Sequence, residues 1–297
     1  MKKNLIIGLF VLFCFSVNAQ ETDTTYKPVI YPQGFTAQLN VVYSTVRDWE
    51  GRMDIYLPSK EKGPSAIIIN IHGGGWKNGV KESQGGFNTF FKAGMAVANI
   101  EYRLTGKATA PAAVEDTRCA LIYLIKNAKA LNIDINRIVI MGGSAGGHLA
   151  LMGGLLANDT RFDGNCAGIK EVKVAAIIDK YGIADVWDWA YGPEHKSSSP
   201  IQWLGDKAKD EAFAKSVSPI HYVNKKSPPT FVVHGDADPT VPYQQSVDLK
   251  KKLDDAGVKN EFITIPGGGH GKFTKEQNAD LNVKILRFLT ELNIVTP

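Results

Sequence analysis

Residues 137–150 read RIVIMGGSAGGHLA, an apolar run that leads into one serine set among glycines. The run has the composition of a buried strand, and a helical pattern follows from Ala145 to Asn158. Ser144 therefore stands at a strand-to-helix junction in the pattern G-x-S-x-G. Glycines here allow a sharp turn that lifts the hydroxyl above the sheet, which predicts a catalytic nucleophile. The alternative is a glycine-rich turn in which Ser144 only caps the helix.

The rest of the chain alternates strand and helix patterns. Two segments at 41–46 and 53–58 predict a hairpin, and further apolar runs lie at 66–72, 95–102, 137–142, 174–182, 229–235 and 261–267. Helical patterns lie at 112–131, 145–158, 246–256 and 276–293. This order predicts an α/β fold with a mostly parallel, eight-stranded sheet and helices on both faces. Residues 184–227 interrupt the alternation and predict a small, partly helical insertion over the carboxyl edge of the sheet.

The first residues, MKKNLIIGLFVLFCFSVNAQ, have the pattern of a secretory signal peptide. Two lysines precede an apolar run from Leu5 to Val17, which is shorter than the roughly 18 residues of a membrane-spanning helix. We expect cleavage after Ala19, one α/β domain over 20–297, and export to the periplasm or medium. Loss of Lys2 and Lys3 lowers the net charge of +4 to +2, which favours neither nucleic acid nor a membrane as partner.

Two cysteines, Cys119 and Cys166, remain after the predicted cleavage. An oxidising compartment permits a disulfide between them. However, Cys119 lies in a helical pattern with apolar neighbours, and a domain of this size needs no covalent link for stability. The sequence therefore favours two buried free thiols.

The strand at 66–72 runs directly into His72-Gly73-Gly74-Gly75-Trp76. Backbone N–H groups can stabilise an oxyanion only where no side chain blocks the approach, and three consecutive glycines meet that need. Neither phosphate-loop pattern, G-x-x-x-x-G-K-[ST] or G-x-G-x-x-G, fits these residues. We predict an oxyanion hole formed by the amides of Gly74, Gly75 and Ala145. The Trp76 amide is the alternative to one of the glycines, and His72 is expected to hold the loop.

Two late strand ends predict an acid and a base for Ser144. FVVHGDADPTVP offers Asp238, with Asp236 in reserve, although both aspartates also suit a simple turn. IPGGGHGKF presents His270 after the last strand, which completes the chain order Ser, Asp, His. His148, on an apolar helix face, is expected to be a core residue. We expect no metal, since the chain contains neither H-E-x-x-H nor a cluster of carboxylates.

Six motifs in this order resemble the secreted α/β-hydrolase carbohydrate esterases of the acetyl esterase and feruloyl esterase (BD-FAE) type, relatives of the hormone-sensitive-lipase-like esterases. They are HGGGW (72–76), EYRL (101–104), GGSAGGHLA (142–150), SPIHYV (218–223), HGDADPTVP (234–242) and GGGHG (267–271). The resemblance implies a serine esterase that deacylates plant cell-wall polysaccharides or small esters without a cofactor.

The chain departs from that family at Lys272, where many relatives have an aromatic residue, and in the few residues before its first strand. An open, shallow site is expected. Trp76 and Trp187 are weak substrate-binding candidates, and packing of the insertion is their alternative role. Two other functions remain open: a formamidase, amidase or serine peptidase on the same fold, and a binding protein that has lost catalysis.

Overall fold

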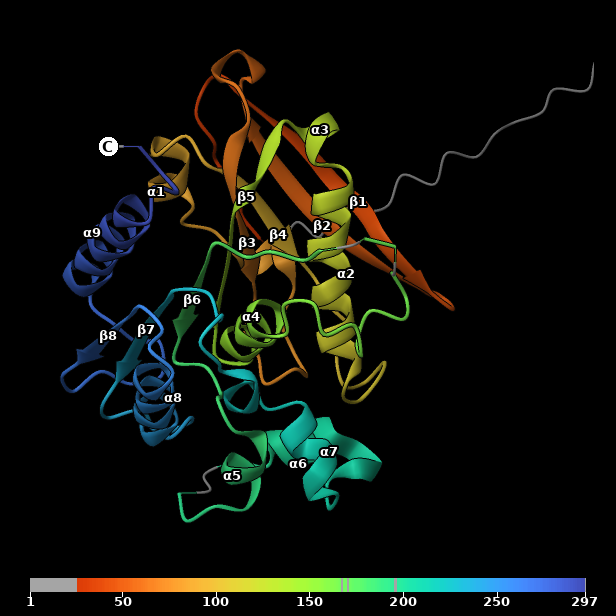
Figure 1. Ribbon diagram of the computed structural model, residues 1–297, viewed down its shortest axis with the longest axis vertical. Coiled ribbons are helices and arrows are strands. Elements are labelled where there is room, and N and C mark those ends of the chain that lie inside the picture. The colour runs from red at the N-terminus through yellow and green to blue at the C-terminus, as the bar shows by residue number, and fades with distance from the viewer. Residues whose placement is uncertain (1–25, 167, 170, 195–196, 297) are drawn as a thin grey trace, which may run out of the picture.

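The computed structural model describes residues 26–166, 168–169, 171–194 and 197–296. The predicted signal peptide lies outside these residues. The described chain forms one eight-stranded sheet in the order β1-β2-β4-β3-β5-β6-β7-β8 (Figure 1). β1 and β2 form the predicted hairpin, β2 pairs antiparallel with β4, and all remaining pairs are parallel. The predicted sheet is therefore confirmed.

The bounds of the elements follow the predicted pattern closely. The strands are β1 (Phe35–Val46), β2 (Trp49–Pro58), β3 (Ser65–Ile71), β4 (Ala96–Ile100), β5 (Ile133–Gly143), β6 (Ala176–Lys180), β7 (Thr230–Gly235) and β8 (Asn260–Ile265). The helices are α1 (Asn88–Lys92), α2 (Ala112–Lys126), α3 (Ala128–Leu131), α4 (Ala145–Leu155), α5 (Val186–Tyr191), α6 (Ser199–Leu204), α7 (Glu211–Ser216), α8 (Gln244–Asp255) and α9 (Lys275–Glu291). Within these described ranges, no helix combines the length and apolar character that crossing a membrane requires.

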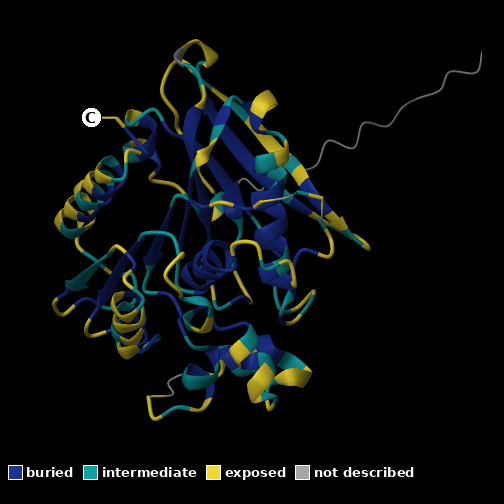
Figure 2. Ribbon diagram, viewed as in Figure 1, coloured by how far each residue is buried: buried dark blue, intermediate teal, exposed yellow. Residues whose placement is uncertain are grey.

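Helices cover both faces of the sheet because its central strands are apolar on both sides. Along β3, Ile67 and Ile69 face the core beneath α2, α4 and α8, whereas Ile68 faces the core beneath α1 and α9. Figure 2 shows the central strands and α4 as buried, with exposed residues on the outer sides of α8 and α9. The two cores hold the carboxyl ends of the parallel strands at one edge, where ligands bind in such sheets.

Besides β2 and β5, which each begin four residues before the predicted segments, two predicted elements differ in their bounds. The single helix expected over 112–131 is divided at Asn127, and Asn132 ends α3 in the left-handed conformation (φ 54°). The first strand begins six residues before the predicted segment. The sequence did not indicate this extension, because the amino-terminal half of the strand lies at the sheet edge and alternates only weakly between buried and exposed residues. Neither difference moves the carboxyl edge of the sheet.

The insertion between β6 and β7 carries α5, α6 and α7, which lie together beyond the carboxyl edge (Figure 1). This placement confirms the predicted insertion. Two of its short helices begin at side-chain caps: Asp185 accepts from the amide of Asp188 in α5, and Asp210 accepts from the amide of Phe213 in α7. The described residues of the insertion thus form a helical layer beyond the carboxyl edge.

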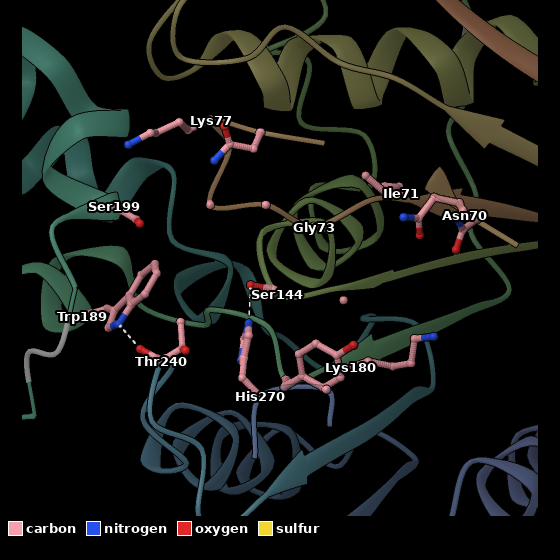
Figure 3. A pocket seen from close by; sticks show the side chains of 17 residues that line it. Asn70, Ile71, Gly73, Lys77, Ser144, Lys180, Trp189, Ser199, Thr240 and His270 are labelled. Carbon is pink, nitrogen blue, oxygen red and sulfur yellow. Dashed lines mark hydrogen bonds between the residues drawn. The ribbon is translucent and has the colours of Figure 1, made fainter. Parts of the chain in front are cut away.

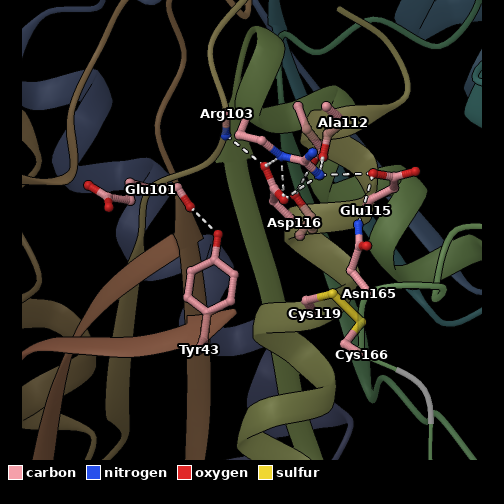
Figure 4. A network of polar contacts seen from close by, with 11 residues as sticks. Tyr43, Glu101, Arg103, Ala112, Glu115, Asp116, Cys119, Asn165 and Cys166 are labelled. Atoms are coloured by element: carbon pink, nitrogen blue, oxygen red, sulfur yellow. Dashed lines mark hydrogen bonds and ion pairs between the residues drawn. A yellow bond between two sulfur atoms is a disulfide. The ribbon is translucent and has the colours of Figure 1, made fainter. Parts of the chain in front are cut away.

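The prediction of two free thiols is wrong, because Cys119 and Cys166 form a disulfide (Figure 4). Their Cα atoms lie 5.3 Å apart, within the usual range for a disulfide. Cys119 is on α2, and Cys166 lies on the segment that follows α4. Sequence alone does not show that this segment folds back against α2, since the two cysteines are 47 residues apart. The disulfide links the segment to the helix.

Candidate active site

Ser144 lies on a strained turn between β5 and α4, with φ 57° and ψ −124°. A Cβ on Gly142 would lie 2.1 Å from the carbonyl oxygen of Gly146, and one on Gly146 would lie 2.2 Å from that of Ile71. Glycine is therefore required at both positions. The Ser144 side chain makes no capping hydrogen bond to α4, so the alternative role as a helix cap is not observed. The hydroxyl is presented above the sheet edge.

The structure brings Ser144, His270 and Asp238 together from three strand ends. His270 Nε2 lies 2.8 Å from Ser144 Oγ (Figure 3), and His270 Nδ1 lies 2.7 Å from Asp238 Oδ2. An ionised carboxylate only accepts, so Nδ1 carries the proton and Nε2 is free to accept the serine proton. Asp236, the reserve candidate, is exposed and accepts a 2.7 Å hydrogen bond from the amide of Gly267. Asp238 is thus the residue in position to orient His270.

Asp238 is buried and held by several donors. Its Oδ1 accepts from the amides of Thr240 (2.7 Å) and Val241 (3.0 Å). Burial acts to raise the pKa of Asp238, but hydrogen bonds from His234, His270 and Thr240 outweigh it and lower the pKa below the usual range. The carboxylate therefore stays ionised beside the imidazole.

The sequence reasoning did not assign His234, which contributes to this site. The buried ring of His234 lies with Nε2 3.2 Å from Asp238 Oδ2 and Nδ1 2.7 Å from Ser246 Oγ. Its position at the end of β7, four residues before Asp238, was the available signal. The other buried histidines serve the scaffold. His72 stacks on Tyr102, and His148 is buried beneath the site with its pKa lowered to about 4 by that burial, as the prediction of a core residue requires.

The three residues predicted to form the oxyanion hole lie around Ser144. Gly74 (φ 113°) and Gly75 (φ 61°) line the same cavity as Ser144, and Ala145 is the first residue of α4. A Cβ on Gly74 would lie 2.1 Å from the carbonyl oxygen of Asn78, so only glycine fits that position. Within the described chain, the amides of Gly74 and Gly75 donate to no other group. They are available to a ligand, as is the first amide of a helix.

The side chain of Trp76 is not at the substrate surface, so its prediction as a binding residue is wrong. The ring is fully buried, stacks on Trp203 (centroids 4.4 Å apart) and donates from Nε1 to His148 Nδ1 at 3.2 Å. Trp203 and Trp189 come from the insertion, and Trp189 also contacts the Trp76 ring (5.8 Å). The alternative packing role is correct: these rings hold the glycine loop against the insertion.

Trp187, the second weak candidate, also lies outside the cavity. It is half-buried and packs on Tyr191 with ring centroids 4.5 Å apart. Trp189 is the tryptophan that borders the cavity, where its Nε1 donates to the carbonyl of Thr240 at 3.2 Å (Figure 3). The rotation of the short helix α5 about its axis decides which of its two tryptophan rings faces the cavity. The sequence does not show this rotation.

The cavity around Ser144 has a volume of about 540 Å³ and a mostly polar lining. Its polar side chains are Asn70, Lys77, Asn78, Gln84, Lys180, Ser199 and Thr240. Figure 3 shows Lys77 and Ser199 on one side of Ser144, and Asn70 and Lys180 on the other. Such a lining suits a hydrated group better than a long alkyl chain.

The sheet order and the strand-to-helix turn at Ser144, with an acid and a histidine on later strand ends, define an α/β-hydrolase. The BD-FAE family profile matches residues 53–253, more than half of the chain. The chain therefore belongs to the BD-FAE family. Ser144 and Asp238 lie inside the matched span, and His270 lies beyond it.

Curated relatives include named esterases. The chain is 28% identical to esterase LipC of Mycobacterium tuberculosis over 72% of its own length and 54% of the relative. It is 28% identical to the ethyl acetate hydrolase of Pseudomonas putida over 69% of its length and 65% of the relative. The chain thus spans about half to two thirds of the length of these relatives.

Solved structures with the same fold include a truncated carbohydrate esterase from gut microbiota, with a TM-score of 0.75 and 31% identity. That match covers 91% of this chain and 99% of the other. A bifunctional GH43-CE protein of Bacteroides eggerthii matches with a TM-score of 0.74 and 26% identity, over 85% of this chain and 35% of the other.

Proposed function

We propose that this protein is a secreted serine esterase that hydrolyses carboxylic ester groups, acetyl or feruloyl, on plant cell-wall polysaccharides or on small esters. One observation carries the proposal: His270 lies 2.8 Å from Ser144 Oγ and 2.7 Å from Asp238 Oδ2. This is the arrangement in which a histidine activates a serine for acyl transfer.

In the proposed mechanism, His270 accepts the proton of Ser144 as Oγ attacks the ester carbonyl carbon. The amides of Gly74, Gly75 and Ala145 stabilise the resulting oxyanion. His270 then gives its proton to the departing alcohol, and a covalent acyl-enzyme remains on Ser144. Water, deprotonated by His270, hydrolyses that ester and restores the serine. Asp238 stabilises the charged imidazole in both steps.

The substrate class is supported by the polar cavity and by the likeness to a carbohydrate esterase. The lining offers hydrogen-bond partners for sugar hydroxyls on both sides of Ser144. The open, shallow site expected for a polymer substrate stays a prediction. Export is part of the proposal and rests on the pattern of residues 1–19 and on the disulfide.

The direct test is hydrolysis of 4-nitrophenyl acetate by the mature protein and by Ser144→Ala. We expect turnover to fall by several orders of magnitude, as in other triad knockouts. Near-native turnover in the variant would exclude Ser144 as nucleophile. Incubation with acetylated xylan and with feruloylated arabinoxylan would identify the acid released. Hydrolysis of N-formylkynurenine with no hydrolysis of any ester would favour a formamidase. Failure to react with a fluorophosphonate probe would favour a binding protein that lacks catalysis.

A further inference from the structure

A second, smaller cavity adjoins the one around Ser144. Its volume is about 120 Å³, and five residues line both cavities: Asn70, Gln84, Lys180, Tyr181 and Gly271. The far wall is formed by apolar side chains of α1 and α9, including Phe90, Leu281 and Ile285. The two cavities therefore meet beside the nucleophile, on the side of His270 and its neighbour Gly271.

Lys180, the last residue of β6, extends along this boundary. Asp179 faces α4, where its Oδ1 would lie 2.4 Å from a Cβ on Gly147, so the alternation of the strand directs Lys180 to the opposite face. Figure 3 shows the Lys180 side chain pointing away from Ser144, on the same side as Asn70. Its ammonium group thus reaches the smaller cavity while its backbone carbonyl binds the Ser144 amide at 2.9 Å.

The Lys180 ammonium group has no partner. It forms neither a hydrogen bond nor an ion pair with any residue that the structure describes. Burial lowers the pKa of Lys180, and no carboxylate counteracts this effect. A partly buried cation without a counter-ion is costly, and natural proteins rarely keep one without a use.

The surrounding residues leave this charge for a ligand. Neither cavity has an aspartate or glutamate among its described lining residues. Glu82, close in sequence to the lining residue Gln84, already pairs with Lys81, which also pairs with Asp54 at 3.1 Å. Carboxamides of Gln84 and Asn282 line the smaller cavity and can add hydrogen bonds to an anion.

We propose that the smaller cavity is a subsite for a carboxylate of the substrate, bound by the Lys180 ammonium group beside the ester that Ser144 attacks. The preferred substrate is then an ester that also carries a carboxylate, either on its alcohol half, as in an acylated uronic acid, or on its acyl half. This inference rests on the proposed esterase activity and refines its substrate class.

The test uses two matched pairs of esters at physiological salt. One pair is the acetylated methyl glycoside of galacturonic acid and that of galactose, which differ in the carboxylate of the alcohol half. The other pair is the mono-4-nitrophenyl ester of adipic acid and its methyl-capped diester, which differ in the carboxylate of the acyl half. The quantity measured is the ratio of kcat/KM for the anionic and neutral members of each pair.

We expect the wild type to prefer the anionic member of one pair, and Lys180→Met to lower that ratio by about 10- to 100-fold, as for loss of a charged hydrogen bond. Lys77→Met is the matched control, because it removes the same charge from the opposite side of the cavity, where Lys77 bonds to Gln202. It should leave the ratio within about two-fold. Lys180→Gln replaces Lys180→Met if the latter does not fold.

The outcomes separate the two proposals. Turnover of neutral esters with no anionic preference, or with a preference that Lys180→Met retains, would overturn the subsite alone. An equal fall of the kcat/KM ratio with Lys77→Met would also overturn the subsite, because the preference would then reflect general attraction of anions by positive charge. No turnover of any of the four esters would overturn the esterase activity itself. The pair that responds assigns the carboxylate to one half of the ester.

Discussion

His234 holds its Nε2 3.2 Å from Oδ2 of Asp238, the same oxygen that accepts the hydrogen bond from His270. Val241 O lies at the same 3.2 Å from Nε2, so this nitrogen faces two acceptors and must carry a proton. The other nitrogen, Nδ1, lies 2.7 Å from Ser246 Oγ, which fixes the orientation of the ring. The Nε2–H group of His234 thus supports the acid together with His270.

Removing this support should impair catalysis without removing the triad. We expect His234→Leu, which has no donor for Asp238, to lower kcat on 4-nitrophenyl acetate by about 10- to 100-fold, the effect of losing one hydrogen bond to a charged group. The Asp238 pKa should rise towards its usual range, because one of the hydrogen bonds that lower it is lost. Ser246→Ala, which leaves the Asp238 contact in place, should have the smaller effect on kcat. An unchanged kcat in His234→Leu would contradict the role given to this histidine.

The two aspartates near the end of β7 should differ sharply. Asp238→Asn removes the charge that orients and stabilises His270, and kcat should fall by about 10⁴-fold, as in other Ser-His-Asp triads. Asp236→Asn should cost only a few-fold, because Asp236 bonds to the amide of Gly267 and not to the ring. Steady-state rates on 4-nitrophenyl acetate compare them directly, and equal losses would reverse the assignment of the acid.

Substitution of two tryptophans of the insertion should have different effects on stability and kinetics. Trp203→Ala leaves a cavity against Trp76, and we expect a loss of about 3–5 kcal/mol in the free energy of unfolding, with a lower kcat as the glycine loop loosens. Trp187→Ala should leave KM unchanged, since that ring is outside the cavity. Denaturant unfolding and steady-state kinetics measure both, and a KM increase confined to Trp187→Ala would restore its predicted binding role.

The disulfide closes a loop whose ends are 47 residues apart, and such a loop contributes about 4 kcal/mol by the chain-entropy relation. The double variant Cys119→Ala, Cys166→Ala should unfold at correspondingly lower denaturant. Reduction of the wild type should reproduce the change, whereas the double variant should not respond to reductant. Two free thiols in wild type purified under oxidising conditions, counted by mass after alkylation, would contradict the bond.

Asp179 predicts a pH dependence of stability. Burial raises its pKa to about 7, against a smaller effect of the Gly182 amide, and neither oxygen has a well-formed hydrogen bond in the described structure. The folded state therefore binds the proton more tightly than the unfolded state, whose pKa lies near 3.8. The contribution of Asp179 to the free energy of unfolding is therefore fully present below about pH 4 and is lost as pH rises through about 7.

The corresponding variant is Asp179→Asn, which cannot ionise. It should be more stable than the wild type above pH 7, by up to about 4 kcal/mol, and should lose the fall in stability between pH 4 and 7. Denaturant midpoints at several pH values measure this change. Asp236→Asn, at an exposed carboxylate, is the control and should keep the wild-type fall. If the stability of Asp179→Asn falls between pH 4 and 7 as much as that of the wild type, the assignment of this fall to Asp179 is refuted.

Local sequence patterns were sufficient for the parts of the site that depend on the backbone. Gly74, Gly142 and Gly146 mark turns where a Cβ would meet backbone atoms, and the order of Ser144, Asp238 and His270 identifies the strand ends. These signals need no knowledge of side-chain packing, which is why the predicted sheet and the predicted meeting of these three residues agree with the structure.

Side-chain partners could not be predicted in the same way. The contact of His234 with Asp238, the orientation of Trp189, and the disulfide depend on how distant segments pack. The place of Lys180 at the boundary of two cavities, with no carboxylate among their described lining residues, likewise depends on how α1 and α9 pack on the sheet.

The stacking of Trp76 on Trp203 joins the loop after β3 to the layer between β6 and β7. The segment that would recognise a substrate is thus also a support for the amides that would hold its oxyanion. Exchange of residues 184–227 with those of a relative would therefore alter rate and selectivity together. Engineering a new specificity in this scaffold calls for transplanting both segments as a unit, or for changes confined to residues that face the cavity alone.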